Sequence, residues 1–266
     1  MRSETFPVGP SPTLVLRLGS GSVQVVEGRV GQILVEASGK GEEGLRLEAA
    51  GDRVVVAQTR QGLVLPTVEV RIAAPPGVAV EAGLASCDMT ISLDASELRA
   101  SLASGDLRAG RVSGMATVKT ASGDVVIDST GDRLVVNAAS GDVRVGRADG
   151  DVRIVTASGD ISIDWAGGTV EVKSASGDTR VGHFDGARLS AHTVSGDVSV
   201  GMAPGRRVDL DVVSHSGDVR LPQPATLLGS GEGEGARAPG PRPEQLRTRL
   251  TFRSVSGDFV LRRIGG

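Results

Sequence analysis

Residues 140–163 read SGDVRVGRADGDVRIVTASGDISI, and this stretch decides the fold because it repeats itself. The triplet Ser-Gly-Asp opens at Ser140 and again at Ser158. Successive triplets are 18 residues apart up to the one at Ser176, and the later steps are 19, 21 and 40 residues. The serines of the full set are Ser104, Ser122, Ser140, Ser158, Ser176, Ser195, Ser216 and Ser256, and a variant triplet with Cys87 in place of glycine falls one period earlier. Self-similarity at a fixed period indicates a repeat architecture.

Apolar residues keep fixed positions within each period. Val143 and Val145 follow one triplet, and Val152 and Ile154 precede the next, with polar residues such as Arg153 between them. Residues two apart along a strand share one face, so each period predicts two short strands separated by two turns.

A single coil of this kind cannot shield its inward valines from water, whereas stacked coils bury them against one another. The sequence therefore predicts an all-β fold, a single-stranded parallel β-solenoid (β-helix or β-roll) with about 18 residues per coil. Right-handed winding is the expected hand. Nine rungs from Ser86 to Ser256 predict a rod of about 40 Å at about 4.8 Å per rung.

The regularity of the period divides the chain into four parts. These are an irregular β N-terminal cap continuous with the solenoid (1–80), regular coils (81–221), a mobile loop rich in glycine and proline (222–247), and a final coil with the C-terminal cap (248–266). Phe252 and Phe259 stand where other coils carry Val or Leu. We expect these larger side chains to close the core at the end of the rod.

Composition and charge exclude several classes of function. The 266 residues include one Trp, four Phe and no Tyr, so rings that could stack on bases are nearly absent. The formal net charge is −3, which gives no basic footprint for nucleic acid. A single cysteine excludes an internal disulfide framework and a multi-cysteine metal site. The chain shows no signal peptide and no apolar run long enough for a transmembrane helix, so a cytoplasmic location is expected, with envelope association as the alternative. No cofactor is expected.

The Ser-Gly-Asp triplets are interpreted as structural turns. Glycine supplies a positive φ at the corner, aspartate accepts a backbone N–H, and serine does so more weakly. The structural turn residues are Ser104, Gly105, Asp106, Ser122, Gly123, Asp124, Ser140, Gly141, Asp142, Ser158, Gly159, Asp160, Ser176, Gly177, Asp178, Ser195, Gly196, Asp197, Ser216, Gly217, Asp218, Ser256, Gly257 and Asp258.

A column of stacked carboxylates is also open to a second interpretation, a calcium ladder. Neighbouring carboxylates one rung apart repel by about 1 kcal/mol in water, and a bound cation would relieve this. The residues concerned are Asp106, Asp124, Asp142, Asp160 and Asp178. The glycine-rich nonapeptide of calcium-binding rolls has a different aspartate spacing, so the structural interpretation is preferred and no metal site is predicted.

Catalytic interpretations are weaker than the structural one, and no catalytic residue is predicted. His192 falls at an outward strand position and His183 in an expected turn, while His215 has a third offset from its nearest triplet, which favours solvated polar residues. Asp128 and Asp164 are a conceivable carboxylate pair for glycoside hydrolysis, but duplication of a two-coil unit explains their placement. No nucleophile elbow surrounds the serines, and Cys87 is expected to pack as a small hydrophobic residue.

The sequence resembles the bacterial "putative adhesin" family of β-strand-repeat proteins, whose function is unknown. The segments that carry the resemblance are the repeated units Thr120–Val125, Thr156–Ile161 and Thr193–Val198, together with Val68–Gly77 ahead of the regular coils. The resemblance covers nearly the whole chain and implies a solenoid fold and an association with bacterial envelopes or envelope-stress systems.

These features together predict a non-enzymatic β-solenoid that serves as a rigid, adhesin-like binding or scaffolding surface, linked to envelope sensing. The expected partner is a protein or an envelope component, with self-association open and nucleic acid excluded. Two alternatives remain, a carbohydrate-active solenoid enzyme and a self-assembling solenoid filament protein.

Overall fold

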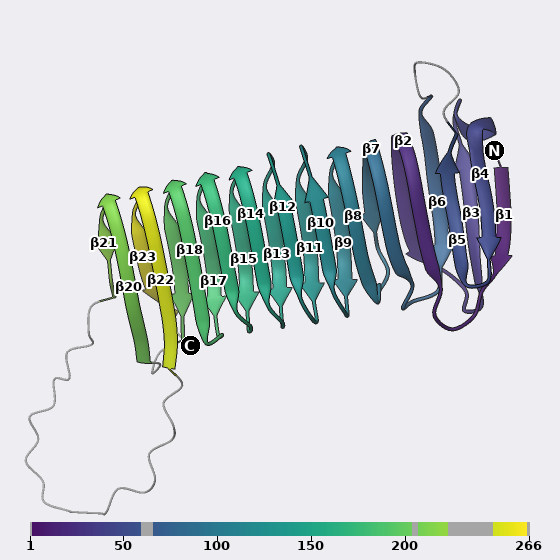
Figure 1. Ribbon diagram of the computed structural model, residues 1–266. Coiled ribbons are helices and arrows are strands. Elements are labelled where there is room, and N and C mark those ends of the chain that lie inside the picture. The colour runs from purple at the N-terminus through teal and green to yellow at the C-terminus, as the bar shows by residue number, and fades with distance from the viewer. Residues whose placement is uncertain (1, 60–65, 204–206, 223–246, 265–266) are drawn as a thin grey trace, which may run out of the picture.

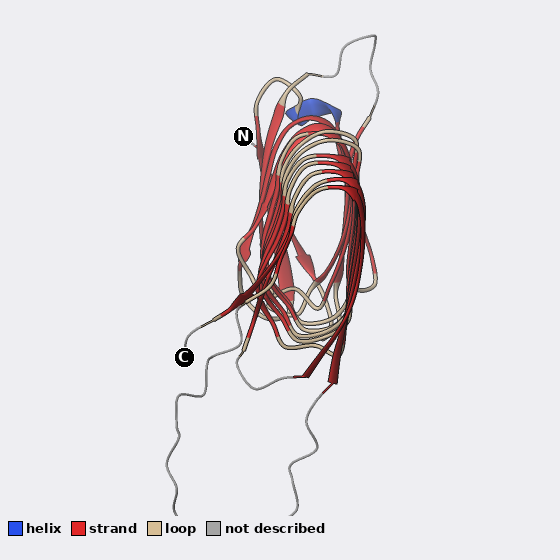
Figure 2. Ribbon diagram, turned by 90° about the vertical axis from the view of Figure 1, so that its left-hand side faces the viewer, coloured by secondary structure: helices blue, strands red, loops and turns tan. Residues whose placement is uncertain are grey.

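The computed structural model describes residues 2–59, 66–203, 207–222 and 247–264 (Figure 1). These residues fold into a rod of stacked β-coils, with one short 3₁₀ helix, Glu42–Gly44, near the N-terminal end. Viewed along the rod, each coil is a flattened oval with two long sides and a turn at either end (Figure 2). The predicted all-β, parallel solenoid is confirmed.

Each regular coil places one strand on either long side, here named the first face and the second face. The strands of the first face are β8 (Glu97–Ser104), β10 (Ala116–Thr120), β12 (Leu134–Ala138), β14 (Val152–Ser158), β16 (Val170–Ser176) and β18 (Arg188–Ser195). Those of the second face are β9 (Leu107–Val112), β11 (Val125–Thr130), β13 (Val143–Ala148), β15 (Ile161–Ala166), β17 (Thr179–Phe184) and β19 (Val198–Met202). The long strands β2 (Thr13–Glu27) and β7 (Ala79–Ile91) run through the corner and contribute to both faces.

The parallel register repeats the sequence period. Val118 on β10 pairs with Val136 on β12, which pairs with Ile154 on β14, each step being 18 residues. All three side chains are fully buried. Like residues therefore stack on like residues along the inside of the rod, and each fully buried aliphatic side chain contributes about 1.5–3 kcal/mol of hydrophobic free energy.

The N-terminal end of the rod is closed by strands of reversed direction. The strands β5 (Arg53–Gln58) and β6 (Val68–Ala74) stack in parallel on β2, which itself pairs in register with β7 as a complete coil. Outside them, β4 (Leu45–Ala50) pairs antiparallel with β5, and β3 (Gln32–Ser38) pairs antiparallel with both β6 and β1 (Arg2–Pro7). This end is therefore a cap that interrupts the parallel stacking.

The C-terminal coils are stacked out of chain order. Strand β22 (Arg247–Ser256) lies between β18 and β20 (Arg207–Ser216), and β23 (Phe259–Arg263) lies between β19 and β21 (Val219–Arg220). The expectation that residues 248–266 close the rod is wrong, because β20 and β21 form the outermost coil. Phe252 and Phe259 stack with ring centroids 5.2 Å apart and are buried by a coil on either side, which shields rings more fully than a terminal position would. Residues 223–246 of the predicted loop lie outside the described residues.

Candidate binding surface

The corners that join the first face to the second are tight turns. Gly141 has a φ of 110° and Gly159 a φ of 120°, in the region that favours glycine. A Cβ placed on Gly141 would lie less than 3.0 Å from the carbonyl oxygen of Gly123 in the adjacent coil. Other triplet glycines with positive φ are Gly105, Gly123, Gly177, Gly196 and Gly257. Both the backbone conformation and the close stacking of the corners therefore require glycine.

The triplet aspartates form a ladder of hydrogen bonds along the rod. Asp142 Oδ1 accepts the backbone N–H of Asp160 at 3.0 Å, and Asp142 donates its own N–H to Asp124 Oδ1 at 2.9 Å. The ladder connects Asp88, Asp106, Asp124, Asp142, Asp160, Asp178, Asp197, Asp258 and Asp218, in that spatial order. Each side chain thus ties its own corner to the next coil.

A buried hydroxyl supports many corners from inside, and the sequence interpretation overlooked it. Thr120 Oγ1 donates to the Ser122 carbonyl at 3.0 Å, and Thr156 Oγ1 donates to the Ser158 carbonyl at 3.0 Å. Ser174 and Thr193 repeat the contact two residues ahead of their triplets. Each buried donor is thereby satisfied. The signal was present, because threonine recurs two positions before the serine.

The calcium ladder stays the less favoured interpretation of the aspartates. In the ranges that the structure describes, no group of three or more His, Cys, Asp or Glu side chains is arranged to hold a metal ion. Each ladder carboxylate already accepts a backbone N–H, and Arg144 Nη2 lies 3.3 Å from Asp142 Oδ2. Backbone donors and arginines therefore counter part of the repulsion between carboxylates.

The other singled-out side chains do not converge on one centre. His183 lies in β17 beside Trp165 of β15, so its expected place in a turn is wrong, since the strand continues to the buried Phe184. His192 Nε2 lies 3.0 Å from Ser190 Oγ on the first face, and His215 is exposed on β20.

Asp128 and Asp164 occupy the second face. Asp128 is exposed within β11 and Asp164 is exposed within β15, with the β13 coil between them. The thiol of Cys87 is buried, and burial, with a smaller contribution from Asp88, raises its pKa to about 11. A thiol with so high a pKa is poorly nucleophilic at neutral pH.

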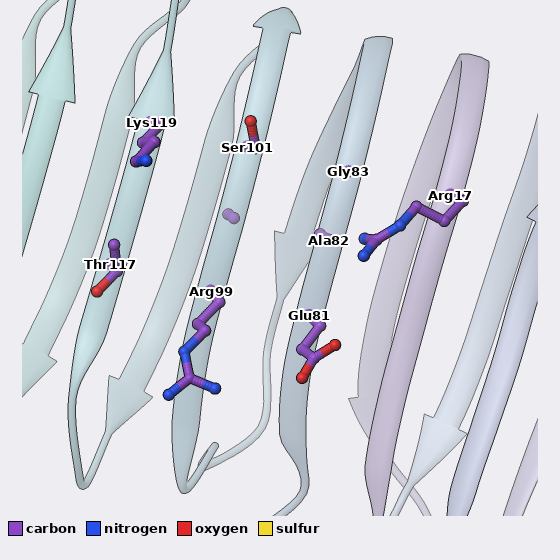
Figure 3. Close-up of a pocket in the computed structure, with 9 residues that line it drawn as sticks. Arg17, Glu81, Ala82, Gly83, Arg99, Ser101, Thr117 and Lys119 are labelled. Atoms are coloured by element: carbon purple, nitrogen blue, oxygen red, sulfur yellow. The ribbon is translucent and has the colours of Figure 1, made fainter.

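A hollow lined by positively charged side chains lies on the outer side of the first face. Arg17, Gly83, Ser101 and Lys119 occupy the same register position on β2, β7, β8 and β10 (Figure 3). The small residues in the middle leave a hollow of about 470 Å³ between the two long cations, with Arg99 and Glu81 along one side. We call this hollow the cationic groove.

The charges in the cationic groove are not all neutralised. Glu81 pairs with Arg53 at 2.9 Å, and Arg99 pairs with Glu97. Arg17 donates to the carbonyl of its neighbour Leu16, and among the described residues neither Arg17 nor Lys119 has a carboxylate within salt-bridge distance. The groove therefore presents two unpaired cations to solvent.

The cationic groove continues into a second hollow of about 680 Å³ that shares Arg17, Gly83 and Ser101. Its floor carries the exposed alanines Ala85, Ala103 and Ala121. Sequence reasoning missed both hollows, because Arg17 precedes the regular period. The available signal was small residues, Gly83 and Ser101, at an outward position where the next coil carries Lys119.

A separate polar depression of about 390 Å³ lies on the outer side of β2, β3 and β6. Glu36 stands opposite Arg71, and Ser38 opposite Glu69, across the antiparallel β3–β6 pair. Glu36 and Glu69 are therefore diagonal neighbours across two strands.

Among the described residues, no helix has the length and apolar character needed to cross a membrane.

The stacked coils, the corner ladder and the hollowed outer face define a β-solenoid repeat protein. The chain belongs to the Toastrack DUF4097 family, whose model matches residues 13–261. No curated protein matches the chain significantly.

Solved bacterial structures share the fold. A "putative adhesin" from Bacteroides fragilis superposes with a TM-score of 0.50 at 11% identity, covering 99% of this chain and 96% of that one. A "putative lipid binding protein" from Parabacteroides distasonis has the same TM-score and coverage at 12% identity. At these identities the likeness concerns the fold alone.

Proposed function

We propose that this protein is a non-enzymatic, adhesin-like binding protein that presents the cationic groove as a rigid surface to a phosphate-bearing envelope component. The observation that carries the proposal is the in-register row Arg17, Gly83, Ser101 and Lys119, with unpaired cations at its ends. The coils beneath it are fixed by parallel hydrogen bonds and by the aspartate ladder. A binding site on such a scaffold loses little conformational entropy when a ligand binds.

The chemistry of the lining favours an anion. Arginine can bind a phosphate through two parallel hydrogen bonds, and lysine binds it as a point charge. The hollow of about 470 Å³ is within the range of ligand sites. The lining has no aromatic ring on which a sugar could stack. An envelope location for this chain agrees with the names of the two fold neighbours, a "putative adhesin" and a "putative lipid binding protein".

The proposal can be tested with two phosphate sources, soluble polyphosphate and vesicles containing phosphatidylglycerol, with phosphatidylcholine vesicles as the blank. Binding to polyphosphate alone would identify a soluble phosphate polymer, and binding to the charged vesicles alone would identify a lipid headgroup. Either Arg17→Glu or Lys119→Glu should weaken binding at least about tenfold, equivalent to about 1.4 kcal/mol.

The matched control is Arg180→Glu, which makes the same charge change at an exposed residue of β17 on the second face. We expect its affinity to remain close to that of the unaltered protein. Equal losses of affinity in Arg180→Glu and Arg17→Glu, or binding to neither probe, would contradict the proposal.

A carbohydrate-active enzyme is the second candidate, because the polar depression holds two carboxylates and an arginine. Glycoside hydrolysis requires paired carboxyl groups on either side of the scissile bond. If this site is catalytic, nitrophenyl glycosides will be hydrolysed and Glu36→Gln and Glu69→Gln will each abolish turnover. Our proposal predicts no turnover in any of the three proteins.

A further inference from the structure

The two ends of the rod differ in the direction of their terminal strands. The N-terminal end carries the antiparallel strands β1, β3 and β4 outside its last parallel coil. At the other end, β20 pairs with β22 along one edge, and no described strand pairs with its second edge. The same holds for β21, which pairs with β23 (Figure 1). The described C-terminal end thus presents two open sheet edges.

Apolar side chains are concentrated at this open end. Val208, Leu210 and Val212 of β20 point toward the core but are only partly buried. A hollow of about 290 Å³ lies between Leu210, Leu261 and Met202. Val213, Val219 and Leu221 are 56%, 45% and 53% exposed. An end of this kind leaves apolar surface that a further pair of strands would bury.

We infer that two copies of this chain join at this end, β20 against β20, about a two-fold axis. A second copy brings two edge strands at the separation of the two faces, together with the inward side chains needed to continue the core. A two-fold contact between identical C-terminal ends uses both of those ends, so the assembly closes at two chains.

Charge and the length of the paired stretch together select the register of this pairing. Inward residues must oppose inward residues, which permits antiparallel registers centred on residues 210, 211, 212 or 213. Centring on Leu210 places Asp209 opposite Asp211 of the partner subunit, and centring on Asp211 places two copies of that aspartate opposite each other. Centring on Val212 or on Val213 avoids like charges, and centring on Val212 pairs the longer stretch of β20 (Arg207–Ser216).

In the register centred on Val212, Asp211 opposes the partner's Val213, and Asp209 opposes the partner's His215. The carboxylate of Asp209 can accept a hydrogen bond from an imidazole N–H. The half-buried Val212 then lies inside the contact rather than in water, and the outward Val213 gains a cross-strand neighbour.

Sedimentation velocity of the full chain over a wide range of concentrations tests this inference. We expect a mass of two chains in the unaltered protein. Val213→Asp places an aspartate opposite Asp211 twice in the interface and should weaken the dimer at least about tenfold. Val194→Asp is the matched control, because Val194 is 54% exposed on the side of the rod, and it should remain dimeric.

A second measurement locates the contact independently of folding effects in the charged variants. Val212 lies on the proposed axis, so Val212→Cys should form a disulfide with its copy under mild oxidation, at a separation that antiparallel strands allow. Cys87 is buried and does not compete. The inference would be overturned if the protein were monomeric at every concentration or formed an assembly larger than two chains. It would also be overturned if Val213→Asp left the dimer intact, or if Val212→Cys failed to form the disulfide in the dimer.

Discussion

At the scale of single residues, the corner glycines limit which sequences can form the rod. Gly141 combines a positive φ with a backbone carbonyl from the next coil where a Cβ would lie. Gly51 also has a positive φ, 60°, but no atom lies within 4 Å of an added Cβ. Substitutions at the two positions therefore distinguish the free-energy cost of a strained backbone conformation from the additional cost of contact with the adjacent coil.

We predict that Gly141→Ala lowers the free energy of unfolding by about 2–4 kcal/mol, and Gly51→Ala by about 1–2 kcal/mol. The difference arises because alanine at residue 141 must also push the neighbouring coil away. Urea denaturation followed by circular dichroism measures both values. If both variants lost the same free energy of unfolding, the close contact between stacked corners would not be what requires glycine at residue 141.

The chemistry of the triplet was predictable from the residue types, whereas the cationic groove was not. Glycine at a turn and aspartate as an acceptor of backbone N–H groups are local properties, so Gly141 and Asp142 could be interpreted without a structure. The groove depends on Arg17 and Lys119, which are far apart in the sequence and line one groove only because β2 stacks on β7. No local pattern specifies that contact.

At the scale of strands, charged side chains on neighbouring coils form a small network across β14 and β16. Glu171 accepts hydrogen bonds from Lys173 at 3.0 Å and Arg153 at 2.6 Å. The hydrogen bond from Lys173, with a further contribution from Arg153, lowers the pKa of Glu171 in the folded protein. The ionised carboxylate therefore stabilises the fold above the ordinary pKa of glutamate, and this contribution is lost as pH falls through the lowered value.

We predict that Glu171→Gln is less stable than the unaltered protein at neutral pH by about 0.5 kcal/mol, a magnitude typical of exposed ion pairs. The difference in free energy of unfolding between the two proteins should vanish as the pH falls through the lowered pKa of Glu171. Added salt should reduce the same difference at neutral pH. Thermal unfolding across a pH series measures it. A difference that is independent of pH would rule out the ion pairs as its cause.

The coil strands were predictable from alternation, but the order of the last coils was not. Strands β20 and β22 both carry inward apolar residues ahead of a Ser-Gly-Asp triplet, so both fit the surface of β18 equally well by pattern. The structure places β22 there because Phe252 pairs with Ala191 on one side and Val212 on the other. Burial of a ring, which is a tertiary effect, decides the order.

At the scale of the whole molecule, the rod has a closed end, a long rigid side and an open end. The cationic groove lies on the side near the closed end, on β2, β7, β8 and β10, and the proposed two-fold contact lies at the open end. Pairing at the open end would place one groove on each arm of a dimer. Two sites on one rigid body increase the strength of attachment to a repetitive surface.

The most direct test of the proposed binding function is a titration of the isotopically labelled protein with polyphosphate, followed by backbone amide resonances. The amides of Gly83 and Ser101 lie in the middle of the cationic groove and serve as reporters. We predict that the largest shifts occur at these two residues and at their neighbours in β7, β8 and β10, and that Lys119→Glu abolishes them. Unchanged Gly83 and Ser101 resonances at saturating ligand, or shifts centred elsewhere on the rod, would contradict the proposal.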